Sequence, residues 1–336
     1  MRTFYHDDQA LHHPHLYFSR GAMRQPQEVP ARLEPLLAAV KRLGGSLETP
    51  PDSGMQAIGE VHALPYLRFL ESAHRRWPED WGAEVISNIF VRENNALRGI
   101  LAEAGRYLAD GSAPVGPDTW RSAYASAQSA IAGADALLHG ERLSYALCRP
   151  PGHHARPDGA GGFCYLNNAA IAAQRLSHHY PRVAILDTDM HHGQGIQETF
   201  YRRGDVLYVS VHGDPTNFYP AVCGFEDERG EGPGDGYNIN LPMPHGAPEA
   251  LFFARLEEAR QALRLYAPDV LVVALGFDIY HDDPQARVSV STDGFSRLGQ
   301  AIAELALPTL IVQEGGYALD ALEKNAYGFF RGLLKQ

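Results

Sequence analysis

Five apolar, β-branched runs between residues 143 and 313 constrain the fold of this chain more than any other feature. They are Leu143–Arg149, Arg182–Asp189, Val206–His212, Asp269–Phe277 and Pro308–Gln313. Amphipathic stretches between and around them predict helices near 121–139, 166–178, 248–265, 293–306 and 319–334. Strands that alternate with helices are typical of a parallel sheet covered on both faces. The sequence therefore predicts an α/β protein.

The N-terminal 75 residues add two predicted helices, near 30–43 and 62–76, with no linker that would detach them. Residues 77–119 are rich in Trp, Gly and Asn and show little periodicity. We predict a long insertion loop there, and loops of that length within a compact domain are usually functional. The whole chain, 1–336, is predicted to be one catalytic domain.

Charge and composition exclude several classes of protein. The 336 residues carry 29 Lys and Arg against 40 Asp and Glu, a net charge of −11, with the basic residues scattered singly. This pattern argues against a nucleic-acid partner. No run approaches a membrane helix, and the start MRTFYHDDQA lacks the apolar core of a signal peptide. With three cysteines and no CxxC pair, we expect a cytoplasmic protein.

Polar residues follow each of the five predicted strands. In open parallel sheets the ligand binds beyond the carboxyl ends of the strands. A single Asp at a strand end is most often the N-cap of the next helix. Five polar strand ends at one sheet edge instead predict a site, and they read RPPGHH (149–154), DTDMHHG (187–193), SVHGD (210–214), GFD (276–278) and EGGY (314–317).

One of these strand ends predicts a metal site. Asp187, Asp189 and His191 follow a period of two, so an extended chain places them on one face. With Asp278 from another strand, the set Asp189, His191 and Asp278 supplies three ligands and leaves a fourth position open, as in catalytic zinc sites. Such oxygen-rich ligation also suits Fe²⁺, Co²⁺ or Mn²⁺. We expect Asp187 to orient a neighbouring histidine.

Three further residues have the chemistry of an amide hydrolase. His153 and His154 follow a Pro-Pro-Gly turn and suit a general base and acid next to a metal. Tyr317 follows two glycines and carries a phenol able to donate to an oxyanion, although a buried Tyr at a turn explains that pattern equally well. The chain has no GxSxG, P-loop or GxGxxG motif.

Taken together, these motifs resemble the histone deacetylase/acetylpolyamine amidohydrolase family, particularly its bacterial acetylpolyamine amidohydrolases. The matching stretches are RPPGHHA (149–155), GGFCYLNNAA (161–170), LDTDMHHGQG (186–195), Asp278 and EGGY (314–317). The resemblance implies the arginase/deacetylase fold, a single parallel sheet of about eight strands flanked by helices. It also implies one Zn²⁺ on Asp189, His191 and Asp278, the tandem pair His153 and His154, and Tyr317 as oxyanion donor.

The resemblance also implies ligands for monovalent cations and residues that line the acyl channel. Structural K⁺ (or Na⁺) sites map onto two sets, Asp187, Asp189, His191, Ser210 and Val211, and Phe200, Arg203, Val206 and Tyr237. The walls of the acyl channel map onto Gly162, Phe163, Phe218, Tyr219, Gln285 and Glu314.

The chain also departs from the family. Gln194, the expected partner of His154, replaces the usual Asp or Asn, and we expect altered tuning with activity retained. The N-terminal acid that helps to receive cationic polyamines has no clear counterpart. We propose Glu93, Glu103 and Asp110 in the insertion as substitutes for amine recognition. In similar enzymes such an insertion packs against a second subunit, so a homodimer is expected.

The sequence thus predicts a zinc-dependent amidohydrolase that removes acetyl or short acyl groups from aliphatic amines, above all N-acetylpolyamines. Three alternatives stay open: an acyl-lysine protein deacetylase, an arginase-like dimetal ureohydrolase, and a non-catalytic binder of acylated ligands. Because the chain carries one complete ligand set, the ureohydrolase is the weaker enzyme alternative.

Overall fold

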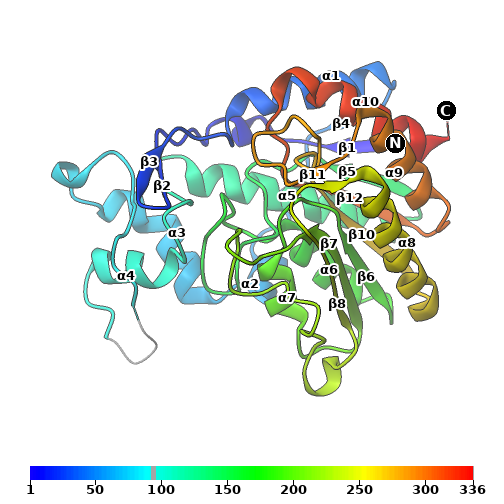
Figure 1. Ribbon diagram of the computed structural model, residues 1–336. Coiled ribbons are helices and arrows are strands. Elements are labelled where there is room, and N and C mark those ends of the chain that lie inside the picture. The colour runs from blue at the N-terminus through cyan, green and yellow to red at the C-terminus, as the bar shows by residue number, and fades with distance from the viewer. Residues whose placement is uncertain (92–95, 336) are drawn as a thin grey trace.

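An eight-stranded parallel sheet forms the centre of the computed structural model, which describes residues 1–91 and 96–335 (Figure 1). The strand order is β4-β1-β5-β12-β10-β6-β7-β8. The strands are β1 (Arg2–Phe4), β4 (Ser46–Glu48), β5 (Leu143–Ala146), β6 (Val183–Asp187), β7 (Val206–Gly213), β8 (Asn238–Met243), β10 (Val270–Leu275) and β12 (Thr309–Gln313). The predicted α/β class and the predicted sheet of about eight strands are confirmed.

All five strands predicted from apolar runs are present, and the other three lack such a run. β1 and β4 have three residues each, too few for a periodic pattern to be visible. β8 reads NINLPM and contains Pro242, which is tolerated because β8 is an edge strand.

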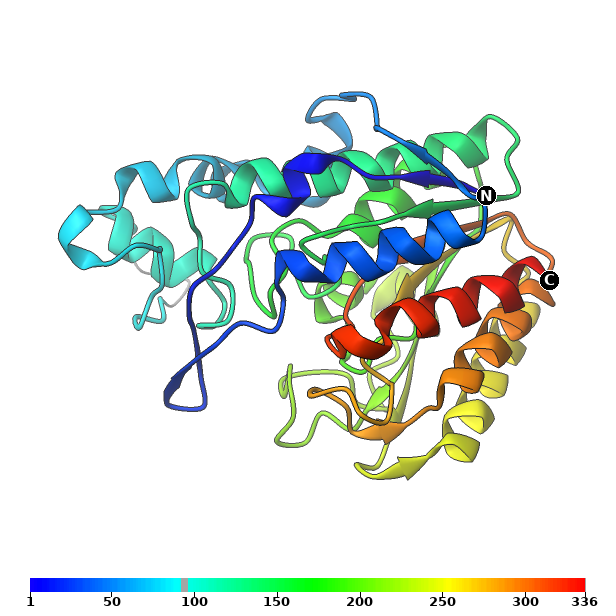
Figure 2. The same ribbon diagram turned by 90° about the horizontal axis from the view of Figure 1, so that it is seen from above.

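Helices cover both faces of the sheet, and the alternation of side chains along the strands gives each face its own core (Figure 2). On β6, for example, Ile185 packs into one core and Leu186 into the other. One layer contains α1 (Leu33–Arg42), α8 (Glu249–Tyr266), α9 (Thr292–Ala303) and α10 (Leu319–Leu334). The other contains α2 (Gln56–Val61), α3 (Leu64–Arg76), α5 (Thr119–Leu138), α6 (Asn168–Ser177) and α7 (Gln194–Phe200).

The predicted irregular loop at 77–119 needs correction, because it contains helix α4 (Ile100–Tyr107) and a 3-10 turn at Glu79–Trp81. Val85 pairs with Val115, and Ala104 and Tyr107 are buried in the core beneath α3 and α5. The helix escaped prediction because its apolar stripe spans only two turns. The described parts of the segment, residues 77–91 and 96–119, therefore pack as part of the domain.

Small elements complete the fold at the carboxyl edge of the sheet. A hairpin joins β2 (Tyr17–Ser19) to β3 (Ala22–Arg24), and β9 (Ala247–Pro248) pairs with β11 (Val288–Ser289). Within the described residues, no helix is long and apolar enough to cross a membrane.

Candidate active site

A cavity of about 870 Å³ opens beyond the carboxyl ends of the central strands. The β2–β3 hairpin, the insertion and the loops after β6, β7, β10 and β12 surround it. Aromatic side chains form much of its wall, together with polar groups such as His154 and Asp110. The lining includes Tyr17, Phe18, Asp110, His154, Gly162, Phe163, His191, Phe218, Tyr219, Gln285 and Tyr317.

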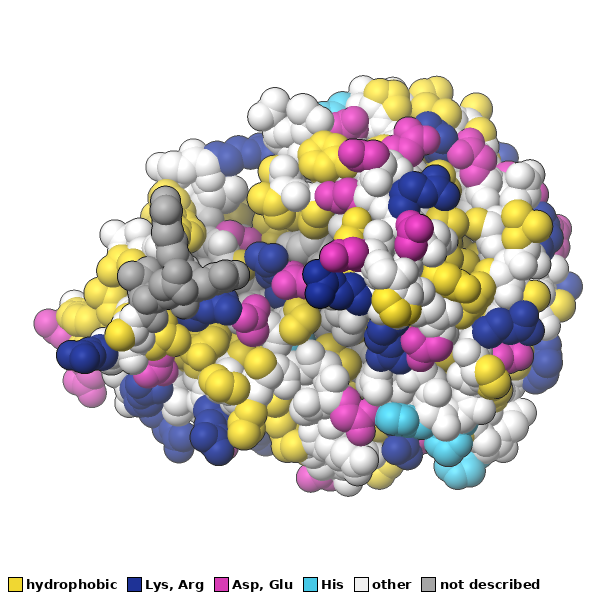
Figure 3. Space-filling model, turned by 90° about the horizontal axis from the view of Figure 1, so that it is seen from below, with side chains coloured by type: hydrophobic (Ala, Val, Ile, Leu, Met, Phe, Trp, Pro, Cys, Tyr) yellow, Lys and Arg dark blue, Asp and Glu magenta, His cyan; other side chains and the backbone are white. Residues whose placement is uncertain are grey.

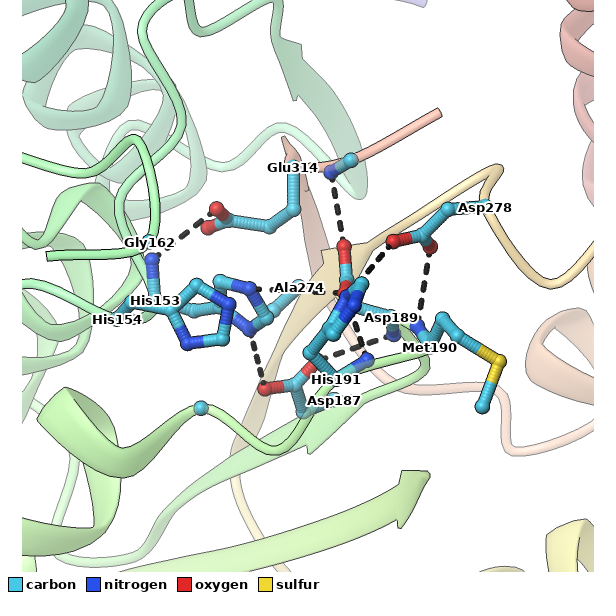
Figure 4. Close-up of polar contacts among 12 residues, drawn as sticks. His153, His154, Gly162, Asp187, Asp189, Met190, His191, Ala274, Asp278 and Glu314 are labelled. Atoms are coloured by element: carbon cyan, nitrogen blue, oxygen red, sulfur yellow. Dashed lines mark hydrogen bonds and ion pairs between the residues drawn. The ribbon is translucent and has the colours of Figure 1, made fainter. Parts of the chain in front are cut away.

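Asp189, His191 and Asp278 converge at the base of this cavity, next to His153 and His154 (Figure 4). Each of the three offers one ligand atom, and these atoms lie within 4.8 Å of one another. They meet because β6 and β10 are neighbours in the sheet. All three side chains are buried.

Backbone amides hold the two carboxylates of this group in place. Gly315 N–H donates to Asp189 Oδ2 at 2.9 Å, and Met190 N–H donates to Asp278 Oδ1 at 3.0 Å. Gly276 and Gly315 have no side chain, and the two carboxylates occupy the space that a Cβ would need. A Cβ added at Gly276 would lie 2.4 Å from an oxygen of Asp189, and one at Gly315 would lie 2.6 Å from oxygens of both aspartates.

The donor set fits a catalytic divalent metal. Two carboxylates and one imidazole give three ligands, and the open side faces the cavity because His191 lines it. Without a cation, two buried carboxylates so close together would repel each other: burial, then the charge of Asp189, raises the pKa of Asp278 to about 7. A divalent cation at this point removes that repulsion.

His153 is paired with a carboxylate. Its Nδ1 lies 3.0 Å from Asp187 Oδ2, which also accepts a hydrogen bond from the Tyr208 hydroxyl at 3.0 Å. Burial by itself lowers the pKa of His153, but the charges of Asp189 and Asp187 outweigh it and raise the pKa to about 10. The carboxylate of Asp187 therefore favours the protonated form of His153.

His154 has a neutral partner. Its Nδ1 lies 2.5 Å from Gln194 Oε1, and its ring lies 3.9 Å from that of His153, centre to centre. Burial lowers the pKa of His154 well below its ordinary value, and its amide partner adds no charge to oppose this. His154 lines the cavity, where a neutral imidazole suits the role of a base.

Tyr317 reaches the cavity from the loop after β12, and a buried arginine holds that loop. Arg32 donates from Nε to Gly316 O at 2.7 Å and from Nη2 to Glu314 O at 2.6 Å, and its guanidinium lies 5.0 Å from the centre of the Tyr317 ring. Burial raises the pKa of Tyr317 well above its ordinary value, although Arg32 opposes this. The phenol is therefore a hydroxyl donor. No sequence motif pointed to Arg32.

Several predicted recognition residues lie elsewhere. Glu314 is fully buried and accepts from Gly152 N–H at 2.7 Å, so its assignment to the channel wall is corrected: the carboxylate supports the backbone of the histidine turn. Glu103 on α4 pairs with Arg76 at 2.6 Å and does not line the cavity, so its role in amine recognition is also corrected. Glu93 lies outside the described residues.

Other predicted residues do lie in the wall of the cavity. Gly162, Phe163, Phe218, Tyr219 and Gln285 line it. Asp110 lines it too, where its Oδ2 accepts from the Tyr219 hydroxyl at 2.7 Å. The β2–β3 hairpin, with Tyr17 and Phe18, is a part of the wall that the sequence did not indicate.

The two predicted monovalent-cation sets lie at opposite ends of β7. Asp187, the last residue of β6, is the register partner of Ser210, which lies in the second half of β7. At the other end, Phe200 ends α7, Val206 begins β7, and Tyr237 O accepts from Tyr208 N–H at 2.9 Å. The side chain of Arg203 is paired there with Asp205 at 2.6 Å.

The fold and the site define a class of α/β proteins in which an Asp, His and Asp set able to hold a metal lies beside a histidine pair. The chain belongs to the histone deacetylase family, because the histone deacetylase domain matches residues 26–333. An acetylpolyamine amidohydrolase of Burkholderia pseudomallei is 65% identical over 335 residues, 99% of this chain and 98% of the relative. Acetylpolyamine amidohydrolase 1 of Pseudomonas aeruginosa is 42% identical over 340 residues, again 99% and 98%.

A solved structure shows the same fold over the full length. The crystal structure of the acetylpolyamine aminohydrolase from Burkholderia pseudomallei superposes with a TM-score of 0.98 at 65% identity, covering 99% of this chain and 98% of that one. The predicted family resemblance is confirmed.

Proposed function

We propose that this chain is a zinc-dependent amidohydrolase that removes acetyl or short acyl groups from aliphatic amines. One observation carries the proposal: the ligand set Asp189, His191 and Asp278 lies at the base of a cavity that the neutral His154 and the phenol of Tyr317 also line. These are the parts that hydrolysis of an unactivated amide requires.

A divalent metal on the three ligands would supply Lewis-acid polarisation of the acyl oxygen and would acidify water. Residues of the chain transfer the protons and stabilise the oxyanion. His154 takes a proton at Nε2 as water adds to the acyl carbon, while Tyr317 donates its hydroxyl hydrogen bond to the developing oxyanion. His154 then gives its proton to the nitrogen as the C–N bond breaks, releasing a carboxylic acid and an amine, which exchange a proton in water to become carboxylate and ammonium. Asp187 orients the His153 ring beside His154 through its hydrogen bond to Nδ1 of His153.

N-acetylpolyamines are the substrates we propose. The names of both relatives above support this choice, and the aromatic walls at Phe163, Phe218 and Tyr219 suit a slim aliphatic chain. Arg and Lys are interspersed with Asp and Glu on the face in Figure 3, which argues against a nucleic-acid partner. Deacetylation of acyl-lysine in proteins is the second candidate, because the family includes histone deacetylases.

Two of the earlier alternatives lose support. A dimetal ureohydrolase needs further ligands, whereas within residues 1–91 and 96–335 the three-residue group above is the one set of His, Cys, Asp and Glu able to hold a metal. A non-catalytic binder has no need of a neutral base and a phenol donor beside the ligands.

Further features of the enzyme are proposals of the same kind. Structural K⁺ or Na⁺ would bind at the two residue sets given above, one beside Ser210 and the other beside Val206. A homodimer through the insertion is supported by exposed apolar residues on that segment, Trp81, Ile89 and Phe90. We also propose that the enzyme works in the cytoplasm as one domain.

A turnover screen with the Zn²⁺-loaded enzyme tests the proposal. The substrates are acetylputrescine, acetylcadaverine, acetylspermidine and an acetyl-lysine peptide, with metal-free enzyme as the control. We expect the highest kcat/KM on an acetylpolyamine. Equal or greater activity on the peptide would favour the second candidate, and no hydrolysis of any of them would overturn the amidohydrolase assignment.

A further inference from the structure

A chain of hydrogen bonds runs from the wall of the cavity to His154. Asp110 Oδ2 lies 2.7 Å from the Tyr219 hydroxyl, which lies 3.1 Å from Gln194 Nε2, and Gln194 Oε1 lies 2.5 Å from His154 Nδ1. The four residues come from four separate segments of the chain. Gln194 and His154 are buried, and the Tyr219 ring stands edge-on to His154 with 4.7 Å between ring centres.

Only one direction of donation satisfies every member of this chain. A carboxylate is an acceptor without a proton to give, so the Tyr219 hydroxyl donates to Asp110. Having donated its proton, the Tyr219 oxygen can only accept, and it accepts from the NH₂ group of Gln194. The carbonyl of Gln194 then faces His154, so Nδ1 of His154 must carry the proton and Nε2 must carry the lone pair.

The contacts of the other carboxylate oxygen, Asp110 Oδ1, support the same direction of hydrogen bonding. Ser112 N–H donates to Asp110 Oδ1 at 2.7 Å, and the Ser112 hydroxyl donates to the same oxygen. Gly162 N–H in turn donates to the Ser112 hydroxyl at 2.9 Å. Asp110 therefore receives three donors and is held as the acceptor at the end of the chain.

We propose that Asp110 is a positioning residue that sets the tautomer of His154 through Tyr219 and Gln194. The partner of a histidine base is ordinarily a carboxylate, which accepts only and so fixes the tautomer directly. Gln194 is an amide that could face His154 with either end. In this chain the carboxylate of Asp110 fixes which end of the Gln194 amide faces His154, and it does so through two hydrogen bonds by way of Tyr219. The inference rests on the proposed function in treating His154 as the base.

The first measurement locates the proton on His154 without using turnover. Full-length, Zn²⁺-loaded enzyme labelled with ¹⁵N-histidine is examined by long-range ¹H–¹⁵N correlation, with His154 assigned by substitution. We expect the parent to hold the proton on Nδ1. Asp110→Asn is isosteric but offers an NH₂ donor, so the chain can reverse and a measurable share of His154 should carry the proton on Nε2. Tyr219→Phe, which removes the link, should do the same.

The second measurement is the kinetic consequence, on an acetamide with an uncharged alkyl tail so that Asp110 has no substrate charge to attract. In hydrolytic triads the wrong tautomer of the histidine lowers kcat by up to ~10⁴. For the mixed tautomers of Asp110→Asn we expect a fall in kcat of about tenfold or more, with KM within about twofold. Asp158→Asn is the matched control, because Asp158 pairs with Arg106 outside this cavity.

The tautomer decides the outcome. A proton that stays on Nδ1 of His154 in both Asp110→Asn and Tyr219→Phe overturns the inference, even where kcat falls, because Asp110 then acts by another route. If the parent hydrolyses no acylated amine, the proposed function fails while the comparison of tautomers still stands.

Discussion

The imidazole of His154 has a neutral partner, with its Nδ1 atom 2.5 Å from Oε1 of Gln194. Its neighbour His153 faces the carboxylate of Asp187 instead, at 3.0 Å. A carboxylate partner stabilises a protonated imidazole and an amide does not, so the difference favours the charged form at His153 and the role of base at His154.

Gln194→Glu tests this division of roles. A carboxylate beside Nδ1 stabilises the protonated form of His154 and raises its pKa. Because His154 acts as a base when neutral, activity should be lost at a higher pH than in the parent. We expect the acidic limb of kcat/KM against pH to move upward by about one unit or more. An unmoved limb would indicate that another group titrates in that profile.

Asp278→Ala removes one of the three proposed metal ligands, so the variant should lose its tightly bound transition metal and its turnover together. The parent should hold one equivalent per chain by elemental analysis after dialysis. Circular dichroism checks that the variant is folded. Two tightly bound equivalents in the parent would instead support a dimetal enzyme.

Tyr317→Phe removes a hydroxyl and little volume. Folding and metal content should persist, while kcat falls by about two to three orders of magnitude, the usual effect of losing an oxyanion donor. Steady-state kinetics on acetylcadaverine measures the change. Turnover close to that of the parent would leave Tyr317 with a packing role.

The proposed dimer predicts a specific effect at Phe90, which is 67% exposed on the insertion. Sedimentation should give a dimer at micromolar concentration, and Phe90→Asp should shift it to monomer, because a charge in an apolar interface is costly. Leu265→Asp on α8 is the matched control, since Leu265 is 87% exposed and lies away from the insertion. A monomeric parent would remove the dimer from the proposal.

Glu28 predicts a pH-dependent effect on stability. Its Oε1 lies 2.9 Å from both Arg32 Nη1 and Arg149 Nε, and all three side chains are buried. Glu28→Gln leaves both cations without their partner and should lower the free energy of unfolding by about 3–5 kcal/mol at pH 7. Glu323→Gln, at an exposed ion pair with Arg42, should change it by less than about 0.5 kcal/mol.

The effect of Glu28 should fade in acid. Burial raises its pKa, but the charges of Arg149 and Arg32 outweigh burial and hold the pKa below the ordinary value of 4.5. The contribution of Glu28 to stability is therefore present above pH 4.5 and is lost as the pH falls through the lower folded-state pKa. Denaturant unfolding of parent and variant at several pH values measures this, and a difference that grows in acid would contradict it.

The sequence by itself determined the class of fold and the groups of the site that are close along the chain. Short apolar, β-branched runs predicted the five central strands, because burial on both faces leaves a pattern that is visible locally. Asp189 and His191 were predicted as neighbours because a period of two places them on one side of an extended chain. The turns that precede them, Pro-Pro-Gly and Gly-Gly, pointed to the histidine pair and Tyr317, and the family motifs agreed.

Tertiary structure decided what depends on residues far apart in the sequence. It placed Arg32 beneath Tyr317, joined Asp110 to Tyr219, and buried Glu314 under the histidine turn when the sequence had assigned it to the channel. It also made a packed helix of residues 100–107. The physical reason is that hydrophobic periodicity is local, whereas a buried polar group must find its partner wherever the folded chain supplies one.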